Sequence, residues 1–207
     1  MTHRIFLVGL GVALSAGAAS AQRPSDLPTS AAVSAPVELD TTGLFLAKYV
    51  SVGDDIFIGG QPTERALRDL KAKGVTVVVN LRTPDEMTRA VRFNEEALVR
   101  ELGMKYVYLP MRGTAEFPYS PAALKTFAET MEAADGKVLL HCTIAWRASH
   151  LWAAYLIEYR KVPAIDALVH ARAVNLMDDH RMDGDTQPID GFLGRQLPEV
   201  GRPPRSP

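Results

Sequence analysis

Short apolar stretches alternate with longer stretches of helical period through the middle of the chain. Four of these stretches are rich in β-branched or aromatic residues, are bounded by Gly, Pro or polar residues, and are predicted to be strands. They cover residues 50–58, 75–79, 106–109 and 138–141. The helical stretches repeat apolar side chains at intervals of three and four. They cover residues 63–74, 86–102, 120–134, 147–159 and 163–176.

The order of these elements predicts the architecture. The run from Val75 to Val79 is apolar apart from one threonine, which is typical of a strand buried on both faces. Strands that alternate with helices are joined by right-handed crossovers into a parallel sheet. We therefore predict an α/β fold with a mostly parallel central sheet and helices on both faces. Ligands of such sheets bind at the carboxyl ends of the strands.

The two ends of the chain have a different composition. Residues 1–21 combine Arg4, an apolar run of fewer than about 20 residues and the small-residue pattern Ala19-Ser20-Ala21, which predicts a signal peptide cleaved before Gln22. We expect export, to the periplasm if the source is bacterial, and no membrane span once the signal is removed. Residues 22–44 are predicted to be a flexible leader, 45–182 the folded domain and 183–207 a Pro- and Gly-rich tail.

The charge balance excludes some function classes. The chain has 23 basic and 24 acidic residues, so no overall field favours nucleic acid, and we expect no nucleic-acid partner. The histidines His150, His170 and His180 lack the paired spacing of a metal site. We predict neither a metal nor another cofactor.

The chain has one cysteine, Cys142, between the last predicted strand and the helix that follows it. Arg147 lies at the predicted start of that helix. Backbone N–H groups at a helix start lack intrahelical partners and favour an anion, and the same field stabilises a thiolate. A guanidinium can present two parallel donors to a tetrahedral anion. We therefore predict an oxyanion-binding loop with Cys142 as nucleophile and substrate contacts from Thr143, Ile144, Ala145 and Trp146 as well as Arg147.

The pair His141-Cys142 followed by a loop and Arg147 resembles the signature of the protein tyrosine and dual-specificity phosphatases. Three upstream segments resemble the opening of a bacterial, phosphatase-like branch of that superfamily. They are Ile58-Gly59-Gly60-Gln61-Pro62-Thr63, Gly74-Val75 and Val79-Asn80-Leu81-Arg82. The resemblance implies a phosphoric monoester hydrolase that acts on a phosphorylated protein or a small phosphate ester. It implies attack by Cys142, a cysteinyl-phosphate intermediate, and an Arg147 that holds the phosphoryl oxygens.

Two further roles are predicted around this loop. We expect His141 to orient the loop by hydrogen bonding, and we also place it among the substrate-binding residues. The related enzymes carry a general acid on the loop after an earlier strand, and Glu116 is the one carboxylate between residues 110 and 119. We take Glu116 as the candidate acid, with Asp85 and Glu86 in reserve.

Two other functions remain open at this stage. Four residues separate Cys142 from Arg147, where the phosphatase signature has five. A four-residue spacing is also that of rhodanese-type sulfurtransferases, which would carry a persulfide on Cys142. The third possibility is an oxyanion-binding module with little catalytic activity.

Overall fold

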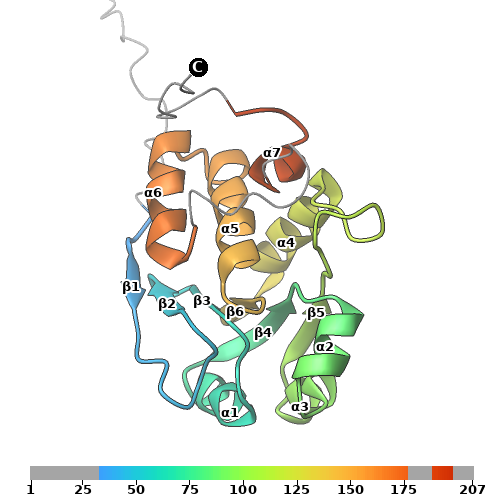
Figure 1. Cartoon of the computed structure of the whole chain (residues 1–207). Helices are drawn as coiled ribbons and strands as arrows, with labels where there is room; N and C mark the ends of the chain where they lie inside the picture. The colour runs from blue at the N-terminus through green and yellow to red at the C-terminus, as the bar shows by residue number, and fades with distance from the viewer. Residues whose placement is uncertain (1–32, 177–187, 198–207) are drawn as a thin grey trace, which may run out of the picture.

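The computed structural model describes residues 33–176 and 188–197, and a six-stranded sheet forms its centre (Figure 1). The strands are β1 (Pro36–Glu38), β2 (Tyr49–Val52), β3 (Ile56–Gly59), β4 (Val75–Asn80), β5 (Lys105–Tyr108) and β6 (Lys137–His141). The helices are α1 (Glu64–Ala72), α2 (Pro84–Ala90), α3 (Glu95–Glu101), α4 (Pro121–Ala133), α5 (Trp146–Glu158), α6 (Ala164–Val174) and α7 (Pro188–Leu193).

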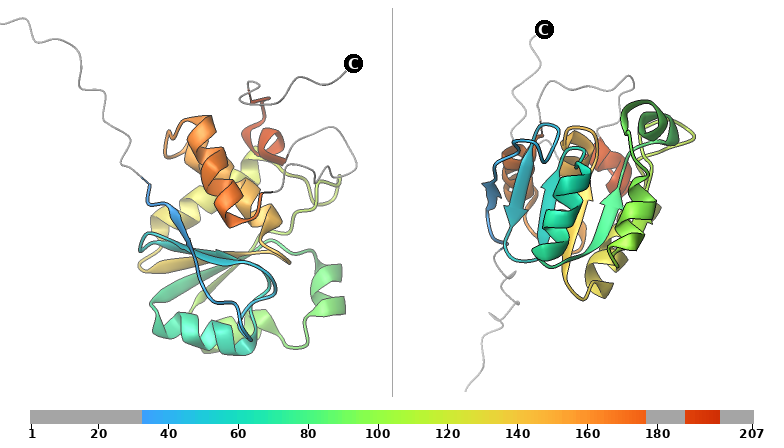
Figure 2. Two further views of the ribbon diagram at one scale, coloured as in Figure 1. Left: turned by 60° about the vertical axis from the view of Figure 1, so that its left-hand side comes forward. Right: turned by 90° about the horizontal axis from the view of Figure 1, so that it is seen from below.

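The sheet has the strand order β1-β2-β3-β6-β4-β5. Strands β3, β6, β4 and β5 pair in parallel, whereas β1 and β2 extend the sheet as an antiparallel edge. Helices α1 and α3 lie on one face and α4 to α7 on the other, as the edge-on view in Figure 2 shows. The predicted α/β class, with a mostly parallel sheet covered on both faces, is confirmed.

Strand β6 divides two hydrophobic cores. Its side chains alternate, so that Leu139 packs among the residues of α1 and α3, while Val138 and Leu140 pack beneath α5. All three are buried. The alternation continues past the end of the strand, where Cys142 belongs to the core cluster beneath α5.

Two predicted elements are each divided in the structure. The segment 50–58 was predicted to be one strand, but Gly53 takes a left-handed φ of 56° and turns the chain into the antiparallel pair β2 and β3. The segment 86–102 was predicted to be one helix, but α2 ends at Ala90. A new helix begins after Asn94, whose side chain accepts a hydrogen bond from the N–H of Ala97.

The predicted ends of the domain also need correction. Residues 22–44 were predicted to be a flexible leader without strands, yet Pro36–Glu38 forms β1 and pairs with β2. Residues 183–207 were predicted to be a tail on the surface, yet α7 buries Ile189 and Phe192 against the helices of the domain. Their spacing of three places both side chains on one face of the helix. The predicted signal peptide lies outside the described residues.

Among the helices of the described part of the chain, none is both long and apolar enough to cross a membrane.

Candidate functional site

The loop that begins with Cys142 leaves the sheet at the carboxyl end of β6. Cys142 is buried, with 1% of its surface exposed. Gly60, just past the end of the neighbouring β3, forms a bridge with Ile144, and the N–H of Gln61 donates to the carbonyl of Thr143 at 3.0 Å. A Cβ on Gly60 would lie 1.6 Å from the carbonyl oxygen of Leu46 and 2.8 Å from that of Thr143, so only glycine permits this close approach.

Helix α5 begins at this loop without a side-chain cap. Helices α1, α3 and α4 each begin with a polar residue whose side chain accepts from the first turn. The N-cap residue of α5 is Ala145, which has a left-handed φ of 67° and no oxygen to offer. The N-terminal end of a helix attracts negative charge, and this one meets the loop of Cys142. The predicted oxyanion-binding role of this backbone stays a prediction.

Arg147, in the first turn of α5, is buried and held by several acceptors. Its Nη1 donates to the carbonyl oxygens of Leu81 at 3.1 Å and Met111 at 2.7 Å. These two carbonyls lie beyond the ends of β4 and β5, and Arg147 itself lies beyond the end of β6. The guanidinium therefore connects the chain segments that follow three neighbouring strands. Burial alone would lower the pKa of Arg147, but the nearby Cys142 and then Glu86 raise it above its usual value.

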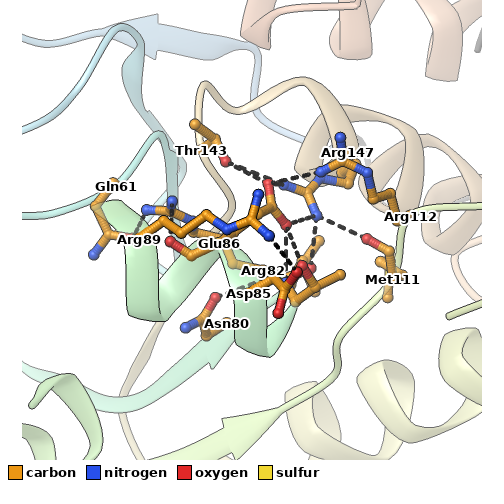
Figure 3. Close-up of polar contacts among 12 residues, drawn as sticks. Gln61, Asn80, Arg82, Asp85, Glu86, Arg89, Met111, Arg112, Thr143 and Arg147 are labelled. Atoms are coloured by element: carbon orange, nitrogen blue, oxygen red, sulfur yellow. Dashed lines mark hydrogen bonds and ion pairs between the residues drawn. The ribbon is translucent and has the colours of Figure 1, made fainter. Parts of the chain in front are cut away.

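The main ionic partner of Arg147 is Glu86, from α2. The carboxylate accepts two parallel hydrogen bonds, from Nη2 to Oε1 at 2.6 Å and from Nη1 to Oε2 at 2.9 Å. The hydroxyl of Thr143 donates to the same Oε1 at 3.0 Å, so that the carboxylate lies between the loop and the guanidinium (Figure 3). Burial would raise the pKa of Glu86, but Arg147, Thr83 and Thr143 together lower it to about 2. Glu86 is therefore ionised at neutral pH.

The predicted loop residues do not all point the same way. Thr143 contacts both Glu86 and Arg147, the latter at 3.1 Å. The carbonyl of Ile144 accepts from Asn175 Nδ2 at 2.5 Å, and the ring of Trp146 packs 4.3 Å from that of His150. The bond from Asn175 thus fixes the loop to the end of α6, whereas the contact of Trp146 lies within α5.

His141, for which an orienting role was predicted, contacts a buried carboxylate. Its side chain is fully buried, and its Nε2 lies 3.0 Å from Glu95 Oε1 on α3. Its predicted place among the substrate-binding residues stays a prediction.

Of the three candidate acids, only Glu86 lies in the site. Asp85 is exposed and pairs with Arg89 along α2. Glu116 is exposed in the 110–119 loop, and no hydrogen bond or ion pair within the described residues joins it to Arg147. The same loop does approach the site, because Arg112 Nη1 lies 3.5 Å from Glu86 Oε1. The acid role of Glu116 stays a prediction.

A buried polar network below the loop was only partly visible in the sequence. Asn80 and Arg82 follow a buried strand and Gln61 follows the Gly-Gly turn, which are positions typical of site residues. Glu95 is the member that sequence reasoning missed. It was placed inside one long helix, where a glutamate normally faces solvent, and only the division into α2 and α3 brings it inward. No cluster of three His, Cys, Asp or Glu suited to a metal ion occurs in the part of the chain described by the structure.

Comparison with known proteins identifies the family. A family model described as "Beta-lactamase hydrolase-like protein, phosphatase-like domain" matches residues 49–156. Beta-lactamase hydrolase-like proteins of Xylella fastidiosa strain Temecula1 and Agrobacterium fabrum are 30% identical over 133 residues and 29% identical over 107 residues. The aligned parts cover 62% and 51% of this chain, but only 30% and 24% of those longer proteins.

Solved structures support the fold. TpbA of P. aeruginosa, solved in complex with phosphotyrosine, has a TM-score of 0.56 at 16% identity, over 78% of this chain and 94% of that one. The active form of Tk-PTP has a TM-score of 0.53 at 19% identity, over 69% of this chain and 93% of that one. These likenesses show a fold shared with tyrosine and dual-specificity phosphatases. Since the family model covers more than half of its residues, the chain belongs to the phosphatase-like domain family of the beta-lactamase hydrolase-like proteins.

Proposed function

We propose that this protein is a cysteine-dependent phosphatase of the tyrosine and dual-specificity type, acting on the phosphomonoester of a protein or of a small molecule. The observation that carries the proposal is the convergence of Cys142, the uncapped start of α5 and the guanidinium of Arg147 at one edge of the sheet. The family membership supports a phosphatase-type fold around this edge. The electrostatic interaction between Cys142 and Arg147 supports their assignment as nucleophile and anion-binding group.

The proposed reaction has two displacements. The Cys142 thiolate forms a bond to phosphorus as the bond from phosphorus to the ester oxygen breaks, and that oxygen leaves with a proton from the general acid. Water then attacks the cysteinyl-phosphate, the phosphorus–sulfur bond breaks, and the thiolate returns with release of phosphate. Arg147 and the amides at the start of α5 stabilise the charge on the transferring oxygens in both steps.

The general acid in this scheme is Glu116. Glu86 is unsuited to that role, because the pKa of about 2 given to it by Arg147 leaves it without a proton to donate. Glu86 instead orients the guanidinium, as an ionised and partly buried carboxylate does for an arginine. Glu116 is solvent-exposed on the same loop as Arg112, which reaches Glu86, and this shared loop supports its assignment as the acid.

Hydrolysis of an activated aryl phosphate by the purified protein tests the proposal. Such an ester has a good leaving group and needs little help from an acid, so its turnover reports on the nucleophile and the anion-binding group. We expect turnover in the wild type and its loss in both Cys142→Ser and Arg147→Ala, because serine is a far poorer nucleophile and the second variant leaves phosphoryl charge uncompensated. The Glu116→Gln variant should keep the aryl activity and slow the hydrolysis of an alkyl phosphate.

Two other results would favour the alternatives. Transfer of sulfur from thiosulfate to cyanide, with a mass increase of one sulfur on Cys142 after incubation with the donor alone, would indicate a sulfurtransferase. A protein inert in both assays but thermally protected by phosphate would indicate an anion-binding module.

We also propose that the protein is exported and processed before Gln22. The support is the apolar run that ends in Ala19-Ser20-Ala21. Intact-mass analysis of protein recovered from the periplasm of an expressing bacterium should give a chain that begins at Gln22. A mass that retains residues 1–21 would contradict this proposal.

A further inference from the structure

A carboxylate lies fully buried on the face of the sheet opposite Cys142. Glu95, the first residue of α3, has no exposed side-chain surface. Its Oε1 accepts hydrogen bonds from His141 Nε2 and Asn80 Nδ2, both at 3.0 Å, and its Oε2 accepts from Gln61 Nε2 at 2.5 Å. A buried charge is costly unless such partners compensate for it, so a carboxylate at this position needs an explanation.

The charge state of Glu95 fixes the direction of these bonds. Burial would raise the pKa of Glu95, but His141, Gln61 and Tyr106 lower it below its usual value. An ionised carboxylate can only accept hydrogen bonds, so His141 must carry a proton on Nε2. This bond fixes the ring of the residue that directly precedes Cys142.

A second chain of bonds leads from Glu95 to the other side of the site. Gln61 receives a hydrogen bond on Oε1 from Arg82 Nη1 at 2.7 Å. Arg82 Nη2 in turn donates to the backbone carbonyl of Glu86 at 2.9 Å, which holds the helix whose carboxylate binds Arg147. Gln61 also donates its backbone N–H to Thr143, inside the loop. Glu95 is thus connected through Gln61 both to Thr143 in the loop and, by way of Arg82, to the helix that carries Glu86.

We propose that Glu95 is a positioning residue for the Cys142 loop, holding it through His141 on one side and through Gln61 and Arg82 on the other. It touches neither the nucleophile nor the bound anion. This role concerns the same loop as the proposed function. It rests on that function only in taking the loop to be catalytic.

Donor and acceptor counting provides a specific test. In Glu95→Gln the new oxygen can keep His141 and Asn80, but the new amide nitrogen then faces the nitrogen of Gln61. If Gln61 turns its amide over, its nitrogen faces Arg82 instead. One link is broken in either arrangement. Adding Gln61→Glu restores an acceptor for both neighbours.

The readout is the pH dependence of thiolate absorbance, taken as the difference from Cys142→Ser, because the chain has only one cysteine. We expect Glu95→Gln to raise the midpoint of thiolate formation and to lower the thiolate fraction at pH 7 several-fold, because the loop that carries Cys142 loses a supporting bond and the stabilisation expected from Arg147 and the start of α5 weakens. Arg147, Arg82 and Tyr119, which interact electrostatically with Cys142, are not substituted in this variant. Loss of the negative charge of Glu95 would by itself lower the midpoint, so a rise reports the loss of support.

The double variant Glu95→Gln/Gln61→Glu should recover most of the lost thiolate. Recovery is partial because the bond from Gln61 Nε2 to the carbonyl of Pro62, at 3.1 Å, is lost. The matched control is Glu96→Gln on the same helix, where the side chain is half exposed and pairs with Arg100. This control should leave the titration unchanged.

A thiolate midpoint that is equal in the wild type and Glu95→Gln would overturn the proposal, as would a double variant no better than the single one. If the single variant does not fold, nitrogen-15 NMR of the wild-type His141 ring decides instead. We expect a proton on Nε2, and an unprotonated Nε2 would contradict the proposed support. Neither measurement requires turnover, so a protein that hydrolyses no ester yet follows these outcomes would refute the phosphatase function alone.

Discussion

At the scale of single residues, the ion pair between Arg147 and Glu86 is the main polar contact of the site. The carboxylate lies where two parallel donors of the guanidinium meet it, and only 17% of its side-chain surface is exposed. Its position also satisfies the hydroxyl of Thr143. The pair therefore holds the guanidinium in one orientation, which in the proposed reaction avoids a cost of ordering.

This ion pair predicts a pH-dependent stability. Because the folded pKa of Glu86 is about 2, below the unfolded value of about 4.5, its contribution is complete above about pH 5 and is lost as the pH falls toward 2. A difference of this size corresponds to about 3 kcal/mol at neutral pH. Urea unfolding at pH 7 should show Glu86→Gln destabilised by an amount of that order, with the gap to the wild type closing at low pH.

The exposed Asp85→Asn on the same helix is the control for this measurement. It should change the free energy of unfolding by less than about 1 kcal/mol, because its pair with Arg89 is solvated. A gap between the wild type and Glu86→Gln that stays constant from pH 7 to pH 3 would show that the lost stability is not ionic.

At the scale of elements, the sequence indicated most of what positions the loop. The buried strand at 138–141, the helix after it and the helix begun by Ser120 and Pro121 all lie close to their predicted bounds, because apolar period and capping residues are local signals. The division of 86–102 was missed because Phe93 and Asn94 do not interrupt the helical period. That break decides which way Glu95 faces. The sequence therefore predicted the Cys142 loop but not the buried bond between Glu95 and His141.

The start of α5 carries a prediction at this same scale. Ala145 takes a left-handed φ of 67°, which costs an L residue roughly 1–2 kcal/mol, whereas glycine pays roughly 0.5–1 kcal/mol in the unfolded chain. Both Ala145 and Ala148 bury their methyl groups, so Ala145→Gly should be less destabilising than Ala148→Gly by about 1–2 kcal/mol in urea unfolding. Ala148→Gly, inside α5, should cost about 1 kcal/mol from helix propensity alone. Equal losses in the two variants would contradict the left-handed conformation at the cap.

At the scale of the whole molecule, the sheet brings together segments that lie far apart in the sequence. Cys142 follows β6, Gln61 follows β3, Arg82 follows β4 and the 110–119 loop follows β5, and all four strands run parallel. Their carboxyl ends share one edge, which explains how a single loop can be braced from every neighbouring strand. Cys142 lies on one face of the sheet and Glu95, its proposed support, on the other.

The aligned region is less than a third of the length of the curated relatives, so the site has to be tested in this chain rather than transferred from them. The most direct test is acid quenching during turnover of an aryl phosphate, followed by peptide mass analysis. We predict one added phosphoryl group on the peptide that contains Cys142, absent in Cys142→Ser and much reduced in Arg147→Ala. Steady release of phosphate without that adduct, or release that survives Cys142→Ser, would contradict a cysteinyl-phosphate mechanism.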